Sequence, residues 1–146
     1  MTGLIASWVD GANDPACPFP LNNLPCGVFS LGGDDLRCGV AIGRSVLDVS
    51  GLEGAGLLVL EGGPLLDVPF WNDLMEAGPA VWSDLRARLA GLLAADSADR
   101  SAVEPFLVPL ADVVLHLPFL VSEYTDFYAG RHHAANVGTM FRGVEN

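Results

Sequence analysis

Short apolar runs separated by turn residues characterise the first half of the chain. Residues 38–42 and 46–49 are two such runs, joined by Gly43-Arg44-Ser45, and this arrangement predicts a β-hairpin. The apolar residues within each run are nearly continuous, which is typical of well-buried strands. The same kind of pattern predicts three further short strands, at residues 28–30, 106–108 and 113–117.

A helical repeat appears in the middle of the chain. Over residues 80–94 apolar side chains recur every three or four positions with charged residues between them, and Pro79 suits a first helical turn. We therefore predict a helix near residues 80–94. A shorter helix is expected within residues 70–77, where Gly78 would end it.

Two other stretches lack a regular pattern. Residues 10–25 are interrupted at almost every step by Gly, Pro, Asn or Asp, and we expect a loop there. Residues 51–66 are rich in Gly and Leu and are ambiguous between helix and loop. Taken together, the patterns in residues 1–118 predict a small α+β or barrel-like module. It contains few polar side chains suited to catalysis.

Composition narrows the class of partner. The chain has 146 residues, of which 18 are acidic and 7 are basic, all of the latter arginines, and its formal net charge is −11. Such a polyanion is repelled by nucleic acids and by anionic membranes, so we expect neither nucleic acid nor membrane as a partner. No apolar run approaches the roughly 18 residues that a membrane-spanning helix needs.

Cysteine usage and the N-terminal residues predict a cytoplasmic protein. Cys17, Cys26 and Cys38 are odd in number and lack the spacing of metal ligands. A bridge between Cys17 and Cys26 would close a short loop, but reduced thiols are the favoured interpretation. Residues 1–9 carry no basic side chain ahead of their apolar stretch, so no secretory signal is expected.

Chemically versatile side chains are concentrated near the end of the sequence. Residues 124–142 hold both tyrosines, two of the three histidines and two of the seven arginines. Asp126 and His133 are seven positions apart, and on a helix this spacing would place them on one face as an acid–base pair or as metal ligands. Asp126 and Tyr128 share a face only in extended chain, so we expect residues 126–128 to be extended.

A helix is expected to follow, from about residue 130 to residue 137, with Gly138 as its C-terminal cap. On that helix His132 and His133 point about 100° apart, so only one of them should face a pocket. A purely structural interpretation stays open, because an Asp before a helix is often an N-cap and a helical His is more often a surface or core residue than a base. Spacing alone favours this structural interpretation.

The same segment resembles the opening of the catalytic domain of the fumarylacetoacetase family. The resemblance rests on YTDFY (residues 124–128) and RHHAANVGTMFR (residues 131–142). Upstream pieces resemble the family's N-terminal region and occur in the family's order: FPLNNLP (19–25), GVF (27–29), GVAIG (39–43) and LHLP (115–118). Together these matches extend over nearly the whole chain and are far more specific than any single motif.

The resemblance implies a mainly β fold with some α. Residues 1–118 would form an SH3-like barrel, and residues 119–146 would form the opening segment of a β-roll catalytic domain. Enzymes of the family hydrolyse a carbon–carbon bond, splitting 4-fumarylacetoacetate into fumarate and acetoacetate at the end of tyrosine and phenylalanine degradation. They are cytoplasmic homodimers that bind calcium or magnesium (Ca²⁺ or Mg²⁺). The same small-molecule substrate, metal and dimer are implied for a complete enzyme that contains this chain.

The resemblance also implies roles for four residues. Asp126 matches a carboxylate ligand of the metal, and His133 matches the general base that activates water. Tyr128 and Arg142 match substrate-binding positions. The chemistry agrees, because hard divalent cations prefer carboxylate oxygen, a neutral imidazole can take a proton from water, and a guanidinium can bind a carboxylate through two hydrogen bonds.

Three departures from the family are present, and one of them qualifies this interpretation. Cys26 stands where the family usually has an aromatic residue, and residues 119–123 match less closely, but neither departure affects an implied role. The sequence stops at Asn146, before the family's other metal carboxylates, the acidic partner of the histidine and the oxyanion-stabilising groups. We therefore expect the chain alone to be inactive and to need a separate catalytic domain. The alternative is a non-catalytic regulatory or assembly module with a remnant site. A metal-binding domain working alone is a weak third alternative, because Asp126 supplies a single hard ligand.

Overall fold

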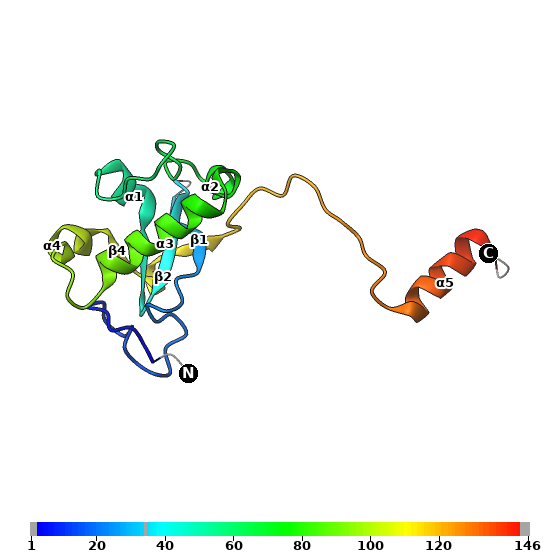
Figure 1. The fold of residues 1–146 in the computed structure, drawn as a ribbon, viewed down its shortest axis with the longest axis horizontal. Helices are drawn as coiled ribbons and strands as arrows, with labels where there is room; N and C mark the ends of the chain where they lie inside the picture. The colour runs from blue at the N-terminus through cyan, green and yellow to red at the C-terminus, as the bar shows by residue number, and fades with distance from the viewer. Residues whose placement is uncertain (1–2, 34, 144–146) are drawn as a thin grey trace.

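A five-stranded antiparallel sheet lies at the centre of the fold (Figure 1). The computed structural model describes residues 3–33 and 35–143. The strand order is β4-β3-β2-β1-β5, so three consecutive strands form a meander and two later strands return to flank it. The strands are β1 (Cys26–Ser30), β2 (Arg37–Ile42), β3 (Ser45–Asp48), β4 (Leu107–Pro109) and β5 (Val114–His116). The predicted mainly β architecture with added helices is confirmed.

The predicted hairpin consists of β2 and β3. Val40 pairs with Leu47, and Ile42 pairs with Ser45 across the turn. Gly43 has a positive φ of 57° in this turn, and a Cβ atom there would collide with the backbone oxygen of Asp10. The turn therefore requires glycine. The close approach of Gly43 to Asp10 fixes the hairpin against the N-terminal loop, which is the segment before β1.

The helices are short apart from one in the middle of the chain and one at its end. The predicted helix at 80–94 is α3, and the shorter one is α2, which ends at Gly78 with a φ of 88°. The ambiguous stretch begins inside α1 and continues as turns. The elements are α1 (Val49–Gly54), α2 (Asn72–Ala77), α3 (Pro79–Leu93), α4 (Arg100–Val103), α5 (Arg131–Arg142) and the 3-10 turns η1 (Glu104–Phe106) and η2 (Leu110–Asp112).

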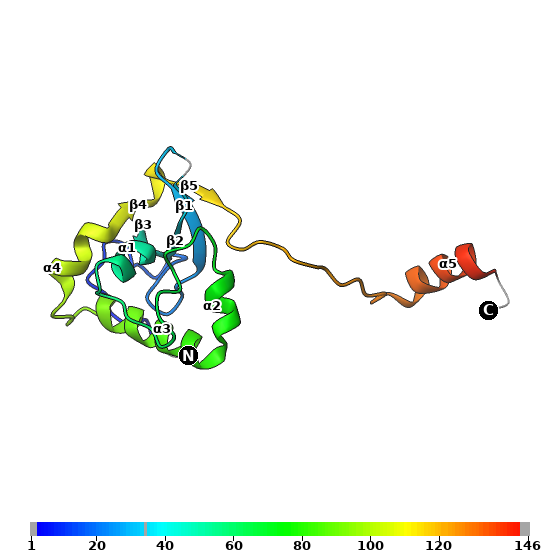
Figure 2. The same ribbon diagram turned by 90° about the horizontal axis from the view of Figure 1, so that it is seen from above.

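The hydrophobic core lies between the sheet and α3. Leu85, Leu89 and Leu93 are the buried residues of α3, and they belong to one cluster with Val40 and Leu47 of the sheet. Figures 1 and 2 both show α3 lying over one face of the sheet. The apolar spacing along α3 therefore corresponds to its packing, as amphipathicity predicts.

The N-terminal loop is fixed to α3 by hydrogen bonds. The Ser7 hydroxyl donates to the Leu93 carbonyl at 2.6 Å, and the Trp8 indole N–H donates to the Leu92 carbonyl at 2.9 Å. Both acceptors are carbonyls at the helix C-terminus, which have no partner within the helix. The loop thus satisfies the end of α3, which explains why a segment without regular structure is well packed.

The C-terminal part of the chain extends away from the sheet. Figures 1 and 2 show residues after β5 as an extended segment that leads to α5, and α5 has no buried residue. The predicted end of this helix is wrong, because α5 continues through Gly138 to Arg142 and stops at Gly143, whose φ is 84°. A helix tolerates an interior glycine at about 1 kcal/mol and ends where glycine adopts positive φ. The domain boundary at residue 118 stays a prediction.

Within residues 3–33 and 35–143, no helix has both the length and the apolar character needed to cross a membrane.

Candidate functional site

The four candidate residues lie in α5 and just before it. Asp126 and Tyr128 belong to the stretch without helix or strand that leads to α5 (Figure 1). His133 lies in the first turn of α5, and Arg142 is its last residue. All four residues are exposed. Any site that these four residues form is therefore exposed to solvent in the part of the chain that the structure describes.

Tyr128 and His133 are in direct contact. The backbone N–H of Ala134 donates to the Gly130 carbonyl at 2.9 Å and closes the first turn of α5 immediately after Tyr128. The Tyr128 and His133 ring centroids are 5.7 Å apart, with an interplanar angle of 52°. This geometry is typical of favourable aromatic pairs. Of the two adjacent histidines, His133 makes the contact.

Tyr128 and Arg142 line the same shallow pocket beside α5. The pocket has a volume of about 380 Å³, and Val137, Gly138 and Phe141 also line it. A Cβ atom at Gly138 would meet no other atom within 4 Å, so this residue leaves the pocket open. The structure thus brings Tyr128 and Arg142 to one pocket, with the ring of His133 against Tyr128. This is the size and character of a site for part of a small molecule.

Helical spacing does not bring Asp126 onto a common face with the other three candidate residues. Because α5 begins at Arg131, Asp126 lies outside the helix, and the shared helical face with His133 does not exist. Asp126 is also not the N-cap, since that position is Gly130. The helical spacing argument and the N-cap interpretation for Asp126 fail for the same reason, which is that the chain between residues 126 and 130 is not helical.

The described residues do not by themselves fit a metal ion. Across residues 3–33 and 35–143, no three or more His, Cys, Asp or Glu side chains are grouped so that they could hold one. Ca²⁺ takes six to eight oxygen ligands, and Mg²⁺ takes an octahedral set. Asp126 would therefore need ligands from outside these residues.

Two thiols of the sheet domain have displaced pKa values. Burial raises the pKa of the Cys38 thiol to about 12, and its hydrogen bond with Ser50 opposes this only in part. Desolvation by the surrounding groups also raises the pKa of the Cys26 thiol, although the residue keeps solvent exposure, and the charge of Arg86 opposes this shift. Both thiols are protonated at neutral pH and are poor nucleophiles. All three cysteines are free.

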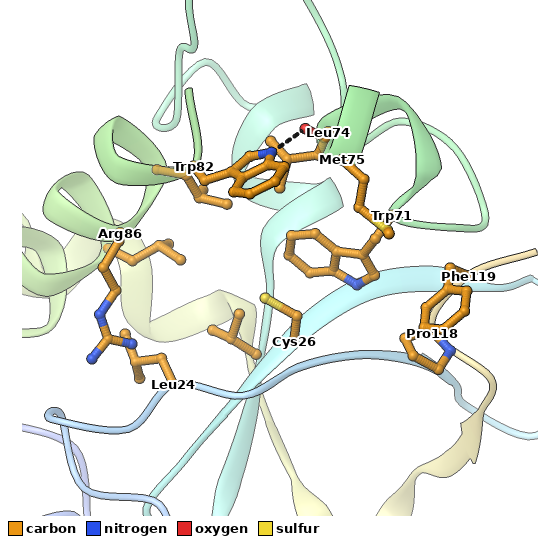
Figure 3. A pocket seen from close by; sticks show the side chains of 12 residues that line it. Leu24, Cys26, Trp71, Leu74, Met75, Trp82, Arg86, Pro118 and Phe119 are labelled. Atoms are coloured by element: carbon orange, nitrogen blue, oxygen red, sulfur yellow. Dashed lines mark hydrogen bonds between the residues drawn. The ribbon is translucent and has the colours of Figure 1, made fainter. Parts of the chain in front are cut away.

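Sequence reasoning missed an apolar pocket beside the sheet. It has a volume of about 510 Å³, and Figure 3 shows Trp71 and Trp82 on its walls with the Cys26 side chain below them. Its lining residues come from five separate parts of the chain, so no local motif could have revealed it. Trp82, which the helical repeat assigns to the buried face, is 44% exposed in the structure and lines this pocket.

Comparison with known proteins identifies the family. The family model described as "Fumarylacetoacetase N-terminal" matches residues 22–118. The chain belongs to this family. The matched region contains the five-stranded sheet and α1 to α4.

Relatives named fumarylacetoacetase match more of the chain. The protein from Bos taurus is 41% identical over 147 residues, covering 96% of this chain and 35% of the relative. The protein from Dictyostelium discoideum is 36% identical over 153 residues, covering 98% of this chain and 35% of the relative. The second match extends through the segment that holds the four candidate residues. The chain spans about a third of the length of these relatives.

Proposed function

We propose that this chain is the N-terminal part of a fumarylacetoacetase-type hydrolase, which cleaves the carbon–carbon bond of 4-fumarylacetoacetate to give fumarate and acetoacetate. The observation that carries the proposal is the similarity, over almost the whole chain, to relatives with that name. The N-terminal family match supports the assignment independently. A role in tyrosine and phenylalanine catabolism follows from the same substrate.

In this proposal the residues around α5 have separate roles in proton transfer and substrate binding. His133 takes a proton from the attacking water, since a neutral imidazole nitrogen can accept a proton in that step. Its contact with Tyr128 orients the imidazole ring, and Tyr128 and Arg142 bind the substrate in the pocket that they line. Arg142 would pair with a substrate carboxylate through two hydrogen bonds.

Asp126 would contribute one carboxylate to a Ca²⁺ or Mg²⁺ site. Its exposed side chain and the preference of these cations for oxygen support this assignment. The remaining ligands would come from a catalytic domain that lies outside the described residues. In this proposal the metal would stabilise negative charge on the substrate only in the completed enzyme. The completed enzyme would act in the cytoplasm.

A further protein surface should cover the segment around α5. Tyr124, Phe127 and Phe141 are each at least 80% exposed, and a helix of 12 residues without buried side chains is marginal in water. Large apolar side chains that are exposed over one segment are typical of a protein–protein interface. The proposed partners are the catalytic domain and, through it, a second copy of the enzyme in a homodimer.

The proposal is tested by supplying the missing part. The purified chain alone should show no hydrolysis of fumarylacetoacetate, because a base without its acidic partner lacks the preorganised electrostatics that dominate catalysis. Mixing it with a separately expressed catalytic domain lacking residues that correspond to 1–146 should restore turnover. A chain that remains inactive in every mixture, although folded and bound, would support the non-catalytic assembly module instead.

His133→Ala and His132→Ala provide the matched pair of variants in that mixture. His133→Ala should reduce turnover by about 10²–10⁴-fold or more, which is the typical contribution of a general base. His132→Ala should retain most of the activity, because His132 is the histidine that does not contact Tyr128. Circular dichroism checks folding. Equal losses in two folded variants would contradict the assignment of His133.

A further inference from the structure

We propose that the apolar pocket between α2, α3 and β1 binds a small carboxylic acid with an apolar body, whose carboxylate pairs with Arg86 (Figure 3). This site lies in the sheet domain, away from α5. The proposal goes beyond the hydrolase function and does not depend on it.

The pocket has the dimensions of a small-molecule site. Its volume of about 510 Å³ falls within the range of about 300–1,000 Å³ typical of ligand pockets. All but one of its lining side chains are uncharged, and most are aliphatic or aromatic. They are Leu24, Cys26, Val40, Trp71, Leu74, Met75, Trp82, Leu85, Arg86, Leu89, Pro118 and Phe119. An apolar ligand body would be desolvated on several sides at once.

The two tryptophans form preorganised apolar walls. The Trp71 indole N–H donates to the Gly27 carbonyl at 2.7 Å, and the Trp82 indole N–H donates to the Leu74 carbonyl at 2.6 Å. Each ring is therefore held in place by its polar edge, which leaves the ring faces to contact a ligand. Figure 3 shows the two rings on adjacent sides of the space above Cys26. Binding would not have to order these side chains first.

The rim of the pocket is also fixed by hydrogen bonds. The Trp71 backbone N–H donates to the Pro118 carbonyl at 3.0 Å. The Asn72 side chain both donates to the Leu120 carbonyl, at 3.0 Å, and accepts from the Leu120 backbone N–H, at 2.9 Å. This pairing holds Pro118 and Phe119 against the start of α2. The pocket therefore has a defined rim on the side where the chain leaves the sheet.

Arg86 determines the charge of the ligand. It is the charged residue of the lining, and its Nη2 donates to the backbone carbonyls of Leu21 at 2.9 Å and Asn22 at 2.7 Å. These bonds anchor the guanidinium, while no carboxylate among residues 3–33 and 35–143 lies within salt-bridge distance of it. Nε and Nη1 donate to no group of the described chain. A guanidinium held in this way is preorganised to bind a carboxylate.

Cys26 contributes an apolar wall and a chemical reporter. Its thiol lies between the tryptophans and Arg86 in Figure 3, and burial raises its pKa. The side chain is therefore uncharged at neutral pH and does not compete with the ligand for Arg86. A bound ligand would shield this thiol from alkylating reagents.

The experiment compares each acid with its neutral amide on the purified 146-residue chain. The probes are 4-phenylbutanoate and octanoate, which separate an aromatic from an aliphatic body, and the two corresponding amides. Nuclear magnetic resonance signals of the indole N–H groups report binding at Trp71 and Trp82. Trp8 is the internal control, because its indole N–H is bonded to the Leu92 carbonyl and it does not line the pocket.

We expect the acids to shift the Trp71 and Trp82 signals and to leave that of Trp8 unchanged. Each amide should bind about tenfold more weakly than its acid, which corresponds to the loss of one charge-assisted hydrogen bond. Equal affinity for acid and amide would overturn the role of Arg86. The absence of any shift at Trp71 and Trp82 at millimolar ligand would overturn the pocket as a small-molecule site.

Substitutions test the location of the binding site independently of the indole N–H resonances. Arg86→Gln should abolish the preference for acid over amide, whereas Arg88→Gln, on the same helix but paired with Asp84 outside the pocket, should keep it. If Arg86→Gln fails to fold, Arg86→Lys keeps the charge and should keep the preference. Cys26→Phe fills the pocket and should abolish binding of acid and amide alike. Unchanged binding by a folded Cys26→Phe variant would refute the location.

Discussion

Gly39 permits close packing of side chains from the two neighbouring strands. A Cβ atom at this position would lie 2.6 Å from the Val46 Cγ1 and 2.8 Å from the Phe29 Cδ1. Val46 and Phe29 are 4% and 1% exposed, so neither can move aside into solvent. Gly39→Ala should therefore destabilise the fold by about 1–3 kcal/mol, the usual cost of overpacking a core.

Gly27 provides the matched control for that prediction. It pairs directly with Gly39 on the neighbouring strand, yet a Cβ atom there would meet nothing within 4 Å. Gly27→Ala should change the free energy of unfolding by no more than about 0.5 kcal/mol. Urea denaturation of both variants measures the difference. Similar losses would show that the effect comes from strand glycines in general rather than from the contacts of Gly39.

Asp48 should make stability fall as pH rises through the acidic range. Burial raises the pKa of Asp48 from its usual 3.8, although the Gly51 N–H and the Arg37 guanidinium, 2.8 Å away, both oppose the shift. The folded state then binds a proton more tightly than the unfolded state, so this group stabilises the fold below pH 3.8 and loses that contribution as pH rises through the raised pKa.

Asp48→Asn isolates this contribution. Asparagine can still cap α1 but has no charge to bury, so the variant should lack that part of the pH dependence. Measured by urea denaturation between about pH 3 and pH 7, the stability of the wild type relative to the variant should decrease with pH and then level off. A relative stability that instead increases with pH would mean that the Arg37 pair outweighs burial.

At the scale of elements, the orientation of the C-terminal segment depends on Asn72 at the start of α2. Its side chain pairs with Leu120 through two hydrogen bonds, as a neighbouring strand would, because it both donates to and accepts from the Leu120 backbone. Asn72→Ala removes both bonds and should accelerate hydrogen exchange at the Leu120 amide by roughly 2- to 10-fold, the equivalent of one modest hydrogen bond. Exchange measured by mass spectrometry or by resonance intensities would report this.

Asn72→Asp separates the two bonds. The aspartate keeps an acceptor for the Leu120 N–H but cannot donate to the Leu120 carbonyl, so exchange at that amide should stay close to the wild-type rate. Exchange that increases equally in Asn72→Ala and Asn72→Asp would show that the amide is protected by something other than this acceptor.

Elements could be predicted where the local signal and the packing agree. The hairpin and α3 were predicted correctly, because Gly43 takes the positive φ that its turn needs and the leucines of α3 are those that it buries. α1 could not be predicted, since Val49–Gly54 contains two glycines and depends on the Asp48 cap and on burial of Val49 and Leu52. The end of α5 was misplaced because Gly138 was expected to be its C-terminal cap, whereas Gly143 is the glycine that adopts the positive φ.

The candidate site was only partly predictable for a related reason. Extended chain before a helix at residues 126–128 was expected, and the turn at Gly130 places Tyr128 against His133 as a result. The apolar pocket could not be predicted, because Cys26, Trp71 and Arg86 become neighbours only through tertiary packing. The assignment of roles to Asp126, Tyr128, His133 and Arg142 rests on family resemblance and stays a prediction.

At the scale of the whole molecule, the fold should not depend on the residues after the Asn72–Leu120 contact. All the buried hydrophobic residues of the described chain lie between Val9 and Val103, and α5 buries none. A chain ending at Val121 keeps β5 and the rim of the apolar pocket. Its melting temperature should therefore match that of the full chain to within about 2–4 °C, the shift expected for less than 1 kcal/mol.

A chain ending at Ala111 is the contrasting truncation, because it also removes β5. β5 pairs with Val28, Phe29 and Ser30 of β1, so its loss would leave the edge of β1 unpaired beside the buried Val28 and Phe29. This shorter chain should be strongly destabilised or unfolded by circular dichroism. If the chain ending at Val121 lost stability to a similar degree, residues 122–146 would be an integral part of the fold, and the proposed domain boundary near residue 118 would be wrong.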